Sequence, residues 1–277
     1  MKHRRSCFSH ALILGSLVAI QAPAAFITFE ANGATPASIT AARDAFRLQV
    51  GGGNTAAANG DFGGLRREIN WDGVPDLRAD SSTLPADFFN TTSPRGAVFS
   101  TPGTGFSVSA NAGLATPILF GFPVELQAFS AQRLFAILGS NVMDINFFLP
   151  GTNTVATTSG FAAIFVDVES ANETKIEFFG AGNTLLYSRF VLAGGNQSLS
   201  FIGATANAGE AISRVRITMP NNFLTSNGSR LNEIQDFVVM DDFLYATPTA
   251  NQVPEPSMLV LASTSILALA ALRSRRR

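Results

Sequence analysis

The stretch FVVMDDFLY, residues 237–245, decides the fold of this chain. As a β-strand it would place Val238, Met240, Asp242 and Leu244 on one face and Val239, Asp241, Phe243 and Tyr245 on the other. Apolar side chains on both faces predict a central strand that is buried on both sides. The two carboxylates in such a strand would need a partner, because an isolated buried charge is costly.

Other segments alternate strictly between apolar and polar residues. They are MDINF (143–147), KIEF (175–178) and RVRITM (214–219), and turn signals such as Pro102-Gly103 and Pro150-Gly151 separate the strands. The chain has 24 Phe against two Tyr and one Trp, which favours a core filled by aromatic rings without polar atoms. We therefore predict a mostly β fold, an antiparallel β-sandwich or jelly roll.

One short N-terminal helix is also expected. Thr35 is the predicted cap, Pro36 suits the first turn and Gly51 ends the helix. The face that packs on the core is expected to carry Ile39, Ala42 and Phe46.

The N-terminal residues 1–25 have the pattern of a secretory signal peptide. Lys2, Arg4 and Arg5 precede an apolar stretch at 11–20, and small residues follow at 22–25. This pattern predicts export through the Sec route and cleavage by signal peptidase. An uncleaved N-terminal anchor is the alternative.

The C-terminal residues 253–277, VPEPSMLVLASTSILALAALRSRRR, have three parts. A Pro-rich linker (248–256) leads to an uncharged segment (257–272) and an Arg-rich tail (273–277). At about 1.5 Å per residue the uncharged segment spans roughly 24 Å, against a hydrocarbon core of about 30 Å. The arginines can reach the headgroups, so we predict a transmembrane helix with a cytoplasmic tail. A buried C-terminal helix of a soluble domain is the alternative.

The order of Pro254-Glu255-Pro256, apolar segment and Arg tail resembles the PEP-CTERM sorting signal of Gram-negative bacteria, a domain also labelled as the C-terminal domain of ice-binding proteins. The resemblance implies recognition and cleavage by an exosortase, in bacteria that make exopolysaccharide. The protein would be anchored transiently in the inner membrane and then reach the cell envelope or the medium.

The body, residues 26–247, also resembles a family of uncharacterised secreted PEP-CTERM proteins. The stretches that carry this likeness are RREINWDGVPD (66–76), LPADFFNTTSPRGAVFSTPGTGF (84–106) and VVMDDFLY (238–245). The resemblance implies a single exported β-sandwich domain and brings no known activity.

Charge and composition exclude several classes of function for the exported body. The signal peptide and the tail hold seven of the 19 basic residues, so residues 26–272, which include the linker, hold 12 basic against 20 acidic residues, a formal net charge of −8. An acidic body disfavours nucleic acid as a partner. His3, Cys7 and His10 all lie in the signal peptide, so the body lacks His and Cys. That excludes His-dependent nucleophilic triads, His- or Cys-ligated zinc or copper, and disulfides.

Glu30 and Asp242 are candidate ligands of a structural calcium ion. The first and last strands lie side by side in jelly rolls, and carboxylates from these regions bind Ca²⁺ in jelly-roll carbohydrate-binding modules, which this pattern loosely resembles. The alternatives are pairing with an arginine such as Arg67 or Arg216, or exposure near a strand end.

Trp71 is a candidate carbohydrate-binding residue, because Glu68, Asp72 and Asp76 surround it in the sequence. A Trp beside carboxylates can stack on a sugar ring and accept hydrogen bonds from its hydroxyls. Two of the carboxylates could also perform glycosidase acid–base chemistry. The alternative is that Trp71 belongs to the core and Asp72-Gly73 opens a turn.

These observations predict an exported, exosortase-sorted protein of the envelope or extracellular polysaccharide matrix. We expect a structural or carbohydrate-binding role without catalysis and with no cofactor except a possible structural Ca²⁺. A carboxylate-based glycoside hydrolase is the second interpretation, and an ice-binding protein is the third.

Processing provides a direct test of the two terminal predictions. Both ends carry the flanks that their peptidases recognise, so export should remove Cys7 first and the terminal arginines later. Intact-mass spectrometry of the secreted protein should therefore find neither segment. Permanent retention of Arg277 in the cell-associated form would identify the tail as a plain anchor.

Overall fold

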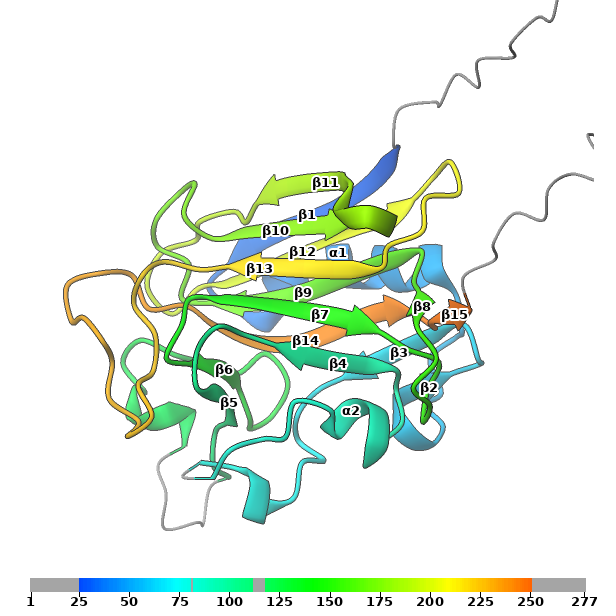
Figure 1. Ribbon diagram of the computed structural model, residues 1–277. Coiled ribbons are helices and arrows are strands. Elements are labelled where there is room, and N and C mark those ends of the chain that lie inside the picture. Colours follow the sequence, from blue (N-terminus) through cyan, green and yellow to red (C-terminus); the bar gives the residue numbers. More distant parts are fainter. Residues whose placement is uncertain (1–24, 81, 112–117, 251–277) are drawn as a thin grey trace, which may run out of the picture.

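The computed structural model describes residues 25–80, 82–111 and 118–250, which form two antiparallel sheets packed face to face (Figure 1). Every pairing between the strands of these sheets is antiparallel. The prediction of a mostly β, antiparallel fold is confirmed.

The larger sheet has eight strands and contains the central strand that FVVMDDFLY predicts. Six strands follow one another across it: β1 (Phe26–Gly33), β12 (Leu199–Ala206), β9 (Gly160–Val166), β14 (Val239–Ala246), β3 (Arg66–Ile69) and β2 (Asp61–Phe62). Beside them, β6 (Phe135–Leu138) pairs with β14 and with β5 (Gly105–Val108). Every residue of β14 is buried, as expected for a central strand.

The smaller sheet has five strands in the order β11 (Leu185–Phe190), β10 (Lys175–Phe179), β13 (Arg214–Thr218), β7 (Val142–Phe147) and β4 (Ala97–Ser100). Three of these strands are the alternating segments read from the sequence. A short ribbon of β8 (Ala156–Thr157) and β15 (Thr249–Ala250) extends strand pairing into the segment predicted as a linker.

The helical elements are few. They are α1 (Pro36–Val50), α2 (Phe88–Thr91) and the 3₁₀ turns η1 (Ala58–Gly60), η2 (Asp76–Arg78), η3 (Leu119–Gly121) and η4 (Ala181–Asn183). The predicted helix α1 is confirmed, with Ile39 and Phe46 buried and Gly51 at its C-terminal end. Thr35 stands at the N-cap position, but its side chain makes no capping hydrogen bond to the backbone.

Aromatic side chains fill the space between the two sheets. Phe161 and Phe243 come from the larger sheet, Phe147 and Phe178 from the smaller one, and all four are buried. Phe161 packs against each of the other three, with ring centroids 5.4–6.4 Å apart. The many Phe residues thus build an apolar interior that contains few polar atoms in need of hydrogen bonds.

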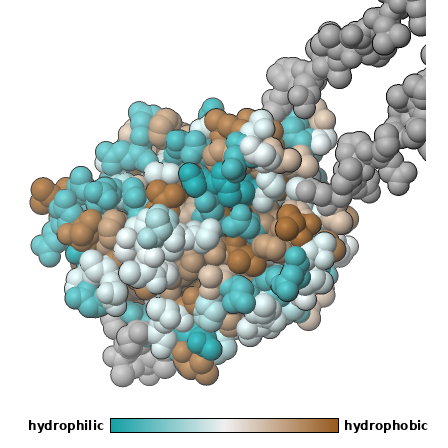
Figure 2. All heavy atoms as spheres, in the orientation of Figure 1, coloured by the Kyte–Doolittle hydropathy of each residue, from teal (hydrophilic) through white to brown (hydrophobic). Residues whose placement is uncertain are grey.

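The outer face of the smaller sheet is polar, which explains the alternation in its strands. Asp144 on β7 accepts hydrogen bonds from Arg214 (2.6 Å) and from Arg216 (2.8 Å) on β13. Figure 2 shows this side of the molecule, where hydrophilic and neutral residues surround isolated hydrophobic ones. The strands of this sheet therefore have one buried and one wet face.

The outer face of the larger sheet is covered by α1 and by the segment around residues 119–129. Phe46 of α1 packs edge-on against Phe29 of β1 and Phe201 of β12. Gly203 of β12 lies directly beneath the helix, and a Cβ atom there would lie 2.5 Å from Cβ of Ala162 and 2.9 Å from the Phe46 ring. The absence of a side chain at Gly203 lets α1 approach the sheet closely.

The expectation that the first and last long strands pair is wrong. In the larger sheet β12 and β9 lie between β1 and β14. At about 4.8 Å per strand, the two are roughly 14 Å apart. The fold keeps two antiparallel sheets but departs from the jelly-roll pairing that the calcium hypothesis assumed.

The predicted signal peptide and transmembrane segment fall almost entirely on residues that the structure does not describe, namely 1–24 and 251–277. Within 25–80, 82–111 and 118–250, no helix has the length and apolar character needed to cross a bilayer.

The close approach at Gly203 generates a stability prediction. In Gly203→Ala the new methyl group must push Ala162 or Phe46 aside, and such overpacking costs about 1–3 kcal/mol. Thermal denaturation should show a melting temperature lower by several degrees, since about 1 kcal/mol corresponds to about 2–4 °C for a domain of this size.

Gly73→Ala is the matched control, because a Cβ at Gly73 meets no heavy atom within 4 Å. It should melt close to the wild-type protein. Equal melting temperatures for the two variants would contradict the packing of α1 on β12 described above.

Candidate functional site

The centre of the site is a β-bulge in β14. Met240 lies opposite Phe165 of β9, but Phe243 lies opposite Ala163, so two residues of β14 face one residue of β9. The extra residue comes from the pair Asp241-Asp242. Met240 and Phe243 therefore both point into the core between the sheets, and the predicted face assignment is wrong beyond the bulge.

Both carboxylates at the bulge meet the segment that covers the outer face of the sheet. The backbone N–H of Phe129 donates to Asp241 Oδ2 (2.6 Å), and the hydroxyl of Ser130 lies 3.1 Å from Asp241 Oδ1 and 2.8 Å from Asp242 Oδ1. Asp241 is fully buried and Asp242 is 5% exposed. Ser130, which no sequence pattern indicated, thus connects the two acids.

Burial changes the acidity of this pair. Burial and the adjacent Asp242 raise the pKa of Asp241 well above its usual range. Burial also raises the pKa of Asp242 to about 6. Two carboxyl groups this close disfavour double ionisation, so the pair retains a proton in mildly acidic solution.

A second cluster fixes the C-terminal end of α1 beside this pair. Glu68 on β3 accepts two hydrogen bonds from Arg47 of α1, at 2.9 and 2.6 Å, and one from Arg66 at 2.6 Å. Arg66 is 1% exposed and donates to the carbonyls of Arg47, Gly51 and Gly53. Arg66 therefore binds carbonyls at and just beyond the end of the helix, of which that of Arg47 also accepts from the backbone N–H of Gly51.

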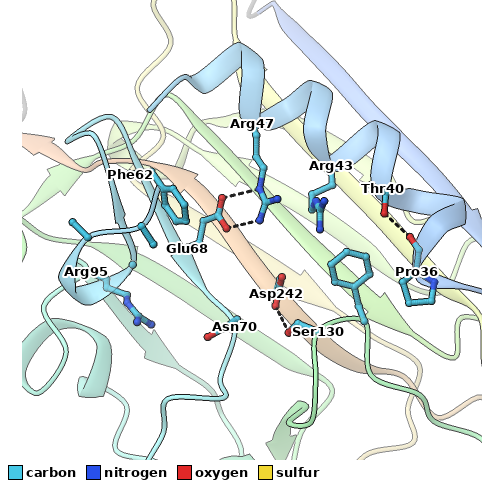
Figure 3. Close-up of a pocket in the computed structure, with 14 residues that line it drawn as sticks. Pro36, Thr40, Arg43, Arg47, Phe62, Glu68, Asn70, Arg95, Ser130 and Asp242 are labelled. Atoms are coloured by element: carbon cyan, nitrogen blue, oxygen red, sulfur yellow. Dashed lines mark hydrogen bonds and ion pairs between the residues drawn. The ribbon is translucent and has the colours of Figure 1, made fainter. Parts of the chain in front are cut away.

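A cavity of about 620 Å³ lies between these two clusters (Figure 3). Figure 3 shows Arg47 and Glu68 paired above it, Asp242 with Ser130 at its floor, and Arg95 and Asn70 on the side opposite α1. Its walls are formed by residues 36, 40, 43, 47, 56, 57, 60, 62, 68, 70, 95, 129, 130 and 242.

The cavity continues along α1. A second cavity of about 610 Å³ shares Arg43, Arg47, Ala56 and Phe62 with the first. Because they share these lining residues, the two cavities adjoin along α1, and we call them together the α1 groove. It combines rings of Phe62 and Phe129 with charged and amide groups.

Trp71 lies in the core. The side chain is 1% exposed, stacks on Phe135 with ring centroids 4.1 Å apart, and donates from Nε1 to the backbone carbonyl of Asp241 at 2.7 Å. In this position it offers no ring face to a sugar, so the core interpretation holds. It supports the α1 groove from below by holding the bulge.

The carboxylates around Trp71 in the sequence do not gather at one site. Glu68 faces the α1 groove, whereas Asp72 accepts hydrogen bonds from the backbone N–H groups of Gln132 and Arg133 at 2.9 and 3.2 Å. Asp76 pairs with the guanidinium of Arg133. Asp72 and Asp76 thus both contact Arg133, apart from Glu68, and all three carboxylates are engaged by donors of the protein itself.

Glu30 and Asp242 are likewise separate. Glu30 forms a bidentate ion pair with Arg189 of β11, at 3.0 and 2.5 Å, across the edge where the two sheets meet. Calcium ligands lie about 2.3–2.6 Å from the ion, so carboxylates three strands apart cannot share one. Arg67 pairs with Asp61 and Arg216 with Asp144, so neither is the partner of Asp242. Among the described residues, no three Asp, Glu, His or Cys side chains form a metal-binding group.

The acid pair generates a pH prediction. The pKa of Asp242 is about 6 in the folded protein against about 3.9 in the unfolded protein. The folded state therefore holds this proton more tightly, and the stability that the protonated carboxyl contributes is fully present below about pH 4 and is lost as pH rises through 6. An Asn cannot ionise. The melting temperature of Asp242→Asn minus that of the wild-type protein should therefore increase as the pH is raised from 4.5 to 7.5.

Asp144→Asn is a control of opposite sign. Partial burial opposes the effect, but hydrogen bonds from Arg216 and Arg214 lower the pKa of Asp144, so its charge stabilises the fold above about pH 4. This variant should melt below the wild-type protein at pH 7. If Asp242→Asn instead tracks the wild-type curve at every pH, the acid pair does not titrate as described.

The predicted sorting motif Pro254-Glu255-Pro256 lies outside the described residues. No protein-family model matches this chain, and no curated protein matches it. Its function must therefore be inferred from the geometry of the α1 groove.

Proposed function

We propose that this chain is an exported protein that binds carbohydrate in the α1 groove. We further propose that an exosortase sorts it to the envelope or matrix through residues 254–256. The observation that carries the first proposal is the joining of aromatic rings and unengaged polar groups in these two adjoining cavities. Sugars present apolar ring faces and hydroxyl groups, and they need both kinds of contact.

Arginines that also line the α1 groove pack against its aromatic rings. The guanidinium of Arg66 packs 4.4 Å from the ring centre of Phe62, and that of Arg43 packs 5.0 Å from the ring centre of Phe129. Such cation–π contacts hold the rings in place before a ligand binds, so less side-chain entropy is lost on binding.

The polar part of the α1 groove includes the side-chain amide of Asn70, which has free hydrogen-bonding capacity within the described chain. Asn70 is exposed in the groove, and its side chain makes no hydrogen bond to any residue of the described chain. An amide offers both a donor and an acceptor, which matches a sugar hydroxyl. The neighbouring Ser130 and Asp242 supply further hydrogen-bonding groups.

The size of the α1 groove fits an oligosaccharide rather than a single small molecule. Each of its two cavities, at about 620 and 610 Å³, falls within the range of about 300–1,000 Å³ for small-ligand sites. Because they adjoin, a chain of several sugars would lie along α1.

Binding without turnover is favoured by the state of Glu68. A glycosidase needs two carboxyl groups that are free to act as acid and as base or nucleophile. Glu68 is engaged by Arg47 and Arg66, and Asp44, which lines the second cavity, is engaged by Arg43. The remaining lining carboxyl, Asp242, accepts a hydrogen bond from Ser130, so the groove supports a binding role over hydrolysis.

A glycan array probed with the purified protein tests this function. Wild-type protein should bind a subset of oligosaccharides, and Asn70→Ala should weaken that binding by about 2- to 12-fold, since a hydrogen bond contributes about 0.5–1.5 kcal/mol. Reducing-sugar assays on the bound glycans should show no cleavage.

Asn153→Ala is the matched control, because Asn153 is an exposed loop amide between β7 and β8 that lines neither part of the α1 groove. It should bind as the wild-type protein does. Equal losses in both variants, or the absence of any bound glycan, would overturn the assignment, and cleavage would favour the glycosidase.

A further inference from the structure

The arginines around the α1 groove differ in how far their guanidinium groups are engaged. Arg47 and Arg66 are saturated by Glu68 and by backbone carbonyls. Arg43 pairs with Asp44, with its Nε and Nη2 atoms 2.9 and 2.8 Å from Oδ1. These three arginines are therefore occupied by the protein itself.

Arg95 is the exception. Its side chain lines the cavity, yet its guanidinium makes no ion pair and no hydrogen bond to any residue in the described ranges. Its Nε is buried and has no partner. A guanidinium carries five donors and a permanent charge, so this group is unusually poorly satisfied.

The protein nevertheless holds Arg95 in a defined place. The guanidinium stacks 4.9 Å from the ring centre of Phe89, and its backbone N–H donates to the carbonyl of Phe89 at 2.8 Å. On the other side, a Cβ at Gly60 would lie 3.0 Å from Nε of Arg95 and 2.2 Å from the carbonyl oxygen of Glu68. Gly60 has φ +59, so both its conformation and its neighbours require glycine.

The geometry points to a ligand that supplies the missing negative charge. Building on the carbohydrate function proposed above, we propose that Arg95 binds the carboxylate of an acidic saccharide, such as a uronic acid, in the α1 groove. A carboxylate matches the planar fork of a guanidinium and can accept two of its hydrogen bonds. The sugar ring would then extend toward Asn70 and the acid pair (Figure 3).

The charges of the α1 groove favour a carboxylated sugar over a densely sulfated one. Asp242 also lines the cavity, and it would repel a ligand that carries negative groups on every face. A uronic acid has one carboxylate for Arg95 and several hydroxyls that can donate to Asp242. Burial lowers the pKa of Arg95, as expected for a cation that lacks a counter-ion.

Paired glycans test this inference apart from the general carbohydrate function. Oligosaccharides of uronic acids are compared with their carboxyl-reduced neutral counterparts, which keep the ring and linkage but lose the charge. Wild-type protein should bind the acidic member at least about 10-fold more tightly. Raising the salt concentration should narrow that difference.

The informative variant is Arg95→Met, which keeps a long side chain over Phe89 but removes the charge. It should bind the acidic and neutral members equally, at the level of the neutral one. Because it removes an unpaired and partly buried cation, its melting temperature should equal or exceed that of the wild-type protein. Arg95→Lys should keep part of the preference, since it retains charge without the planar fork.

Arg78→Met is the matched control, an exposed arginine on η2 that lines neither cavity. It should keep the full acidic preference. If wild-type protein binds both members of each pair equally, the Arg95 assignment is wrong while the carbohydrate function stands. If it binds no glycan, both proposals fail.

Discussion

The bulge at Asp241-Asp242 is the constraint on which the rest of the site depends. By placing two residues of β14 opposite Ile164, it turns both carboxylates away from the aromatic core and toward α1 and Ser130. At the bulge the backbone carbonyl of Asp241 accepts a hydrogen bond from the indole N–H of Trp71. A bulge in a central strand is tolerated because its buried polar atoms find these partners.

The second level of organisation is the engagement of charge around α1. Arg66 joins three things: the end of the helix, Glu68 on β3, and the ring of Phe62. Because this buried cation is fully satisfied, it costs little to keep and it makes the wall of the α1 groove rigid. Arg95, in contrast, makes no ion pair and no side-chain hydrogen bond within the described residues, and we propose that a ligand supplies its counter-charge. The contrast between two neighbouring arginines is therefore the most informative chemical feature of the groove.

Individual strands of this structure could be predicted from the sequence, whereas the β-bulge and the strand order could not. The alternation of apolar and polar residues predicted β7, β10 and β13, because the outer faces of these strands are exposed to solvent. The ion pairs of Asp144 lie on that exposed face. The central position of β14 followed from apolar residues on both of its faces. A period of two cannot reveal a bulge, however, and the only hint was a pair of acids within an apolar strand. Strand order in the sheet depends on long-range contacts, so the separation of Glu30 from Asp242 could not be read locally.

Trp71 shows why composition near a residue is a poor guide to its role. Three acids surround it in the sequence and suggest a sugar platform, yet all three bind other parts of the protein. Glu68 binds arginines of the helix layer, and Asp72 and Asp76 hold the segment at Arg133. The indole is thereby enclosed, and its single polar atom serves the backbone of β14. The ring that was expected to stack on a sugar instead lies in the core, and the lining of the α1 groove includes Asn70, Arg95 and Ser130, which come from three separate parts of the chain. Such a site arises only from the sheet order that brings β3, β14 and the loop before β6 together, so no linear motif could mark it.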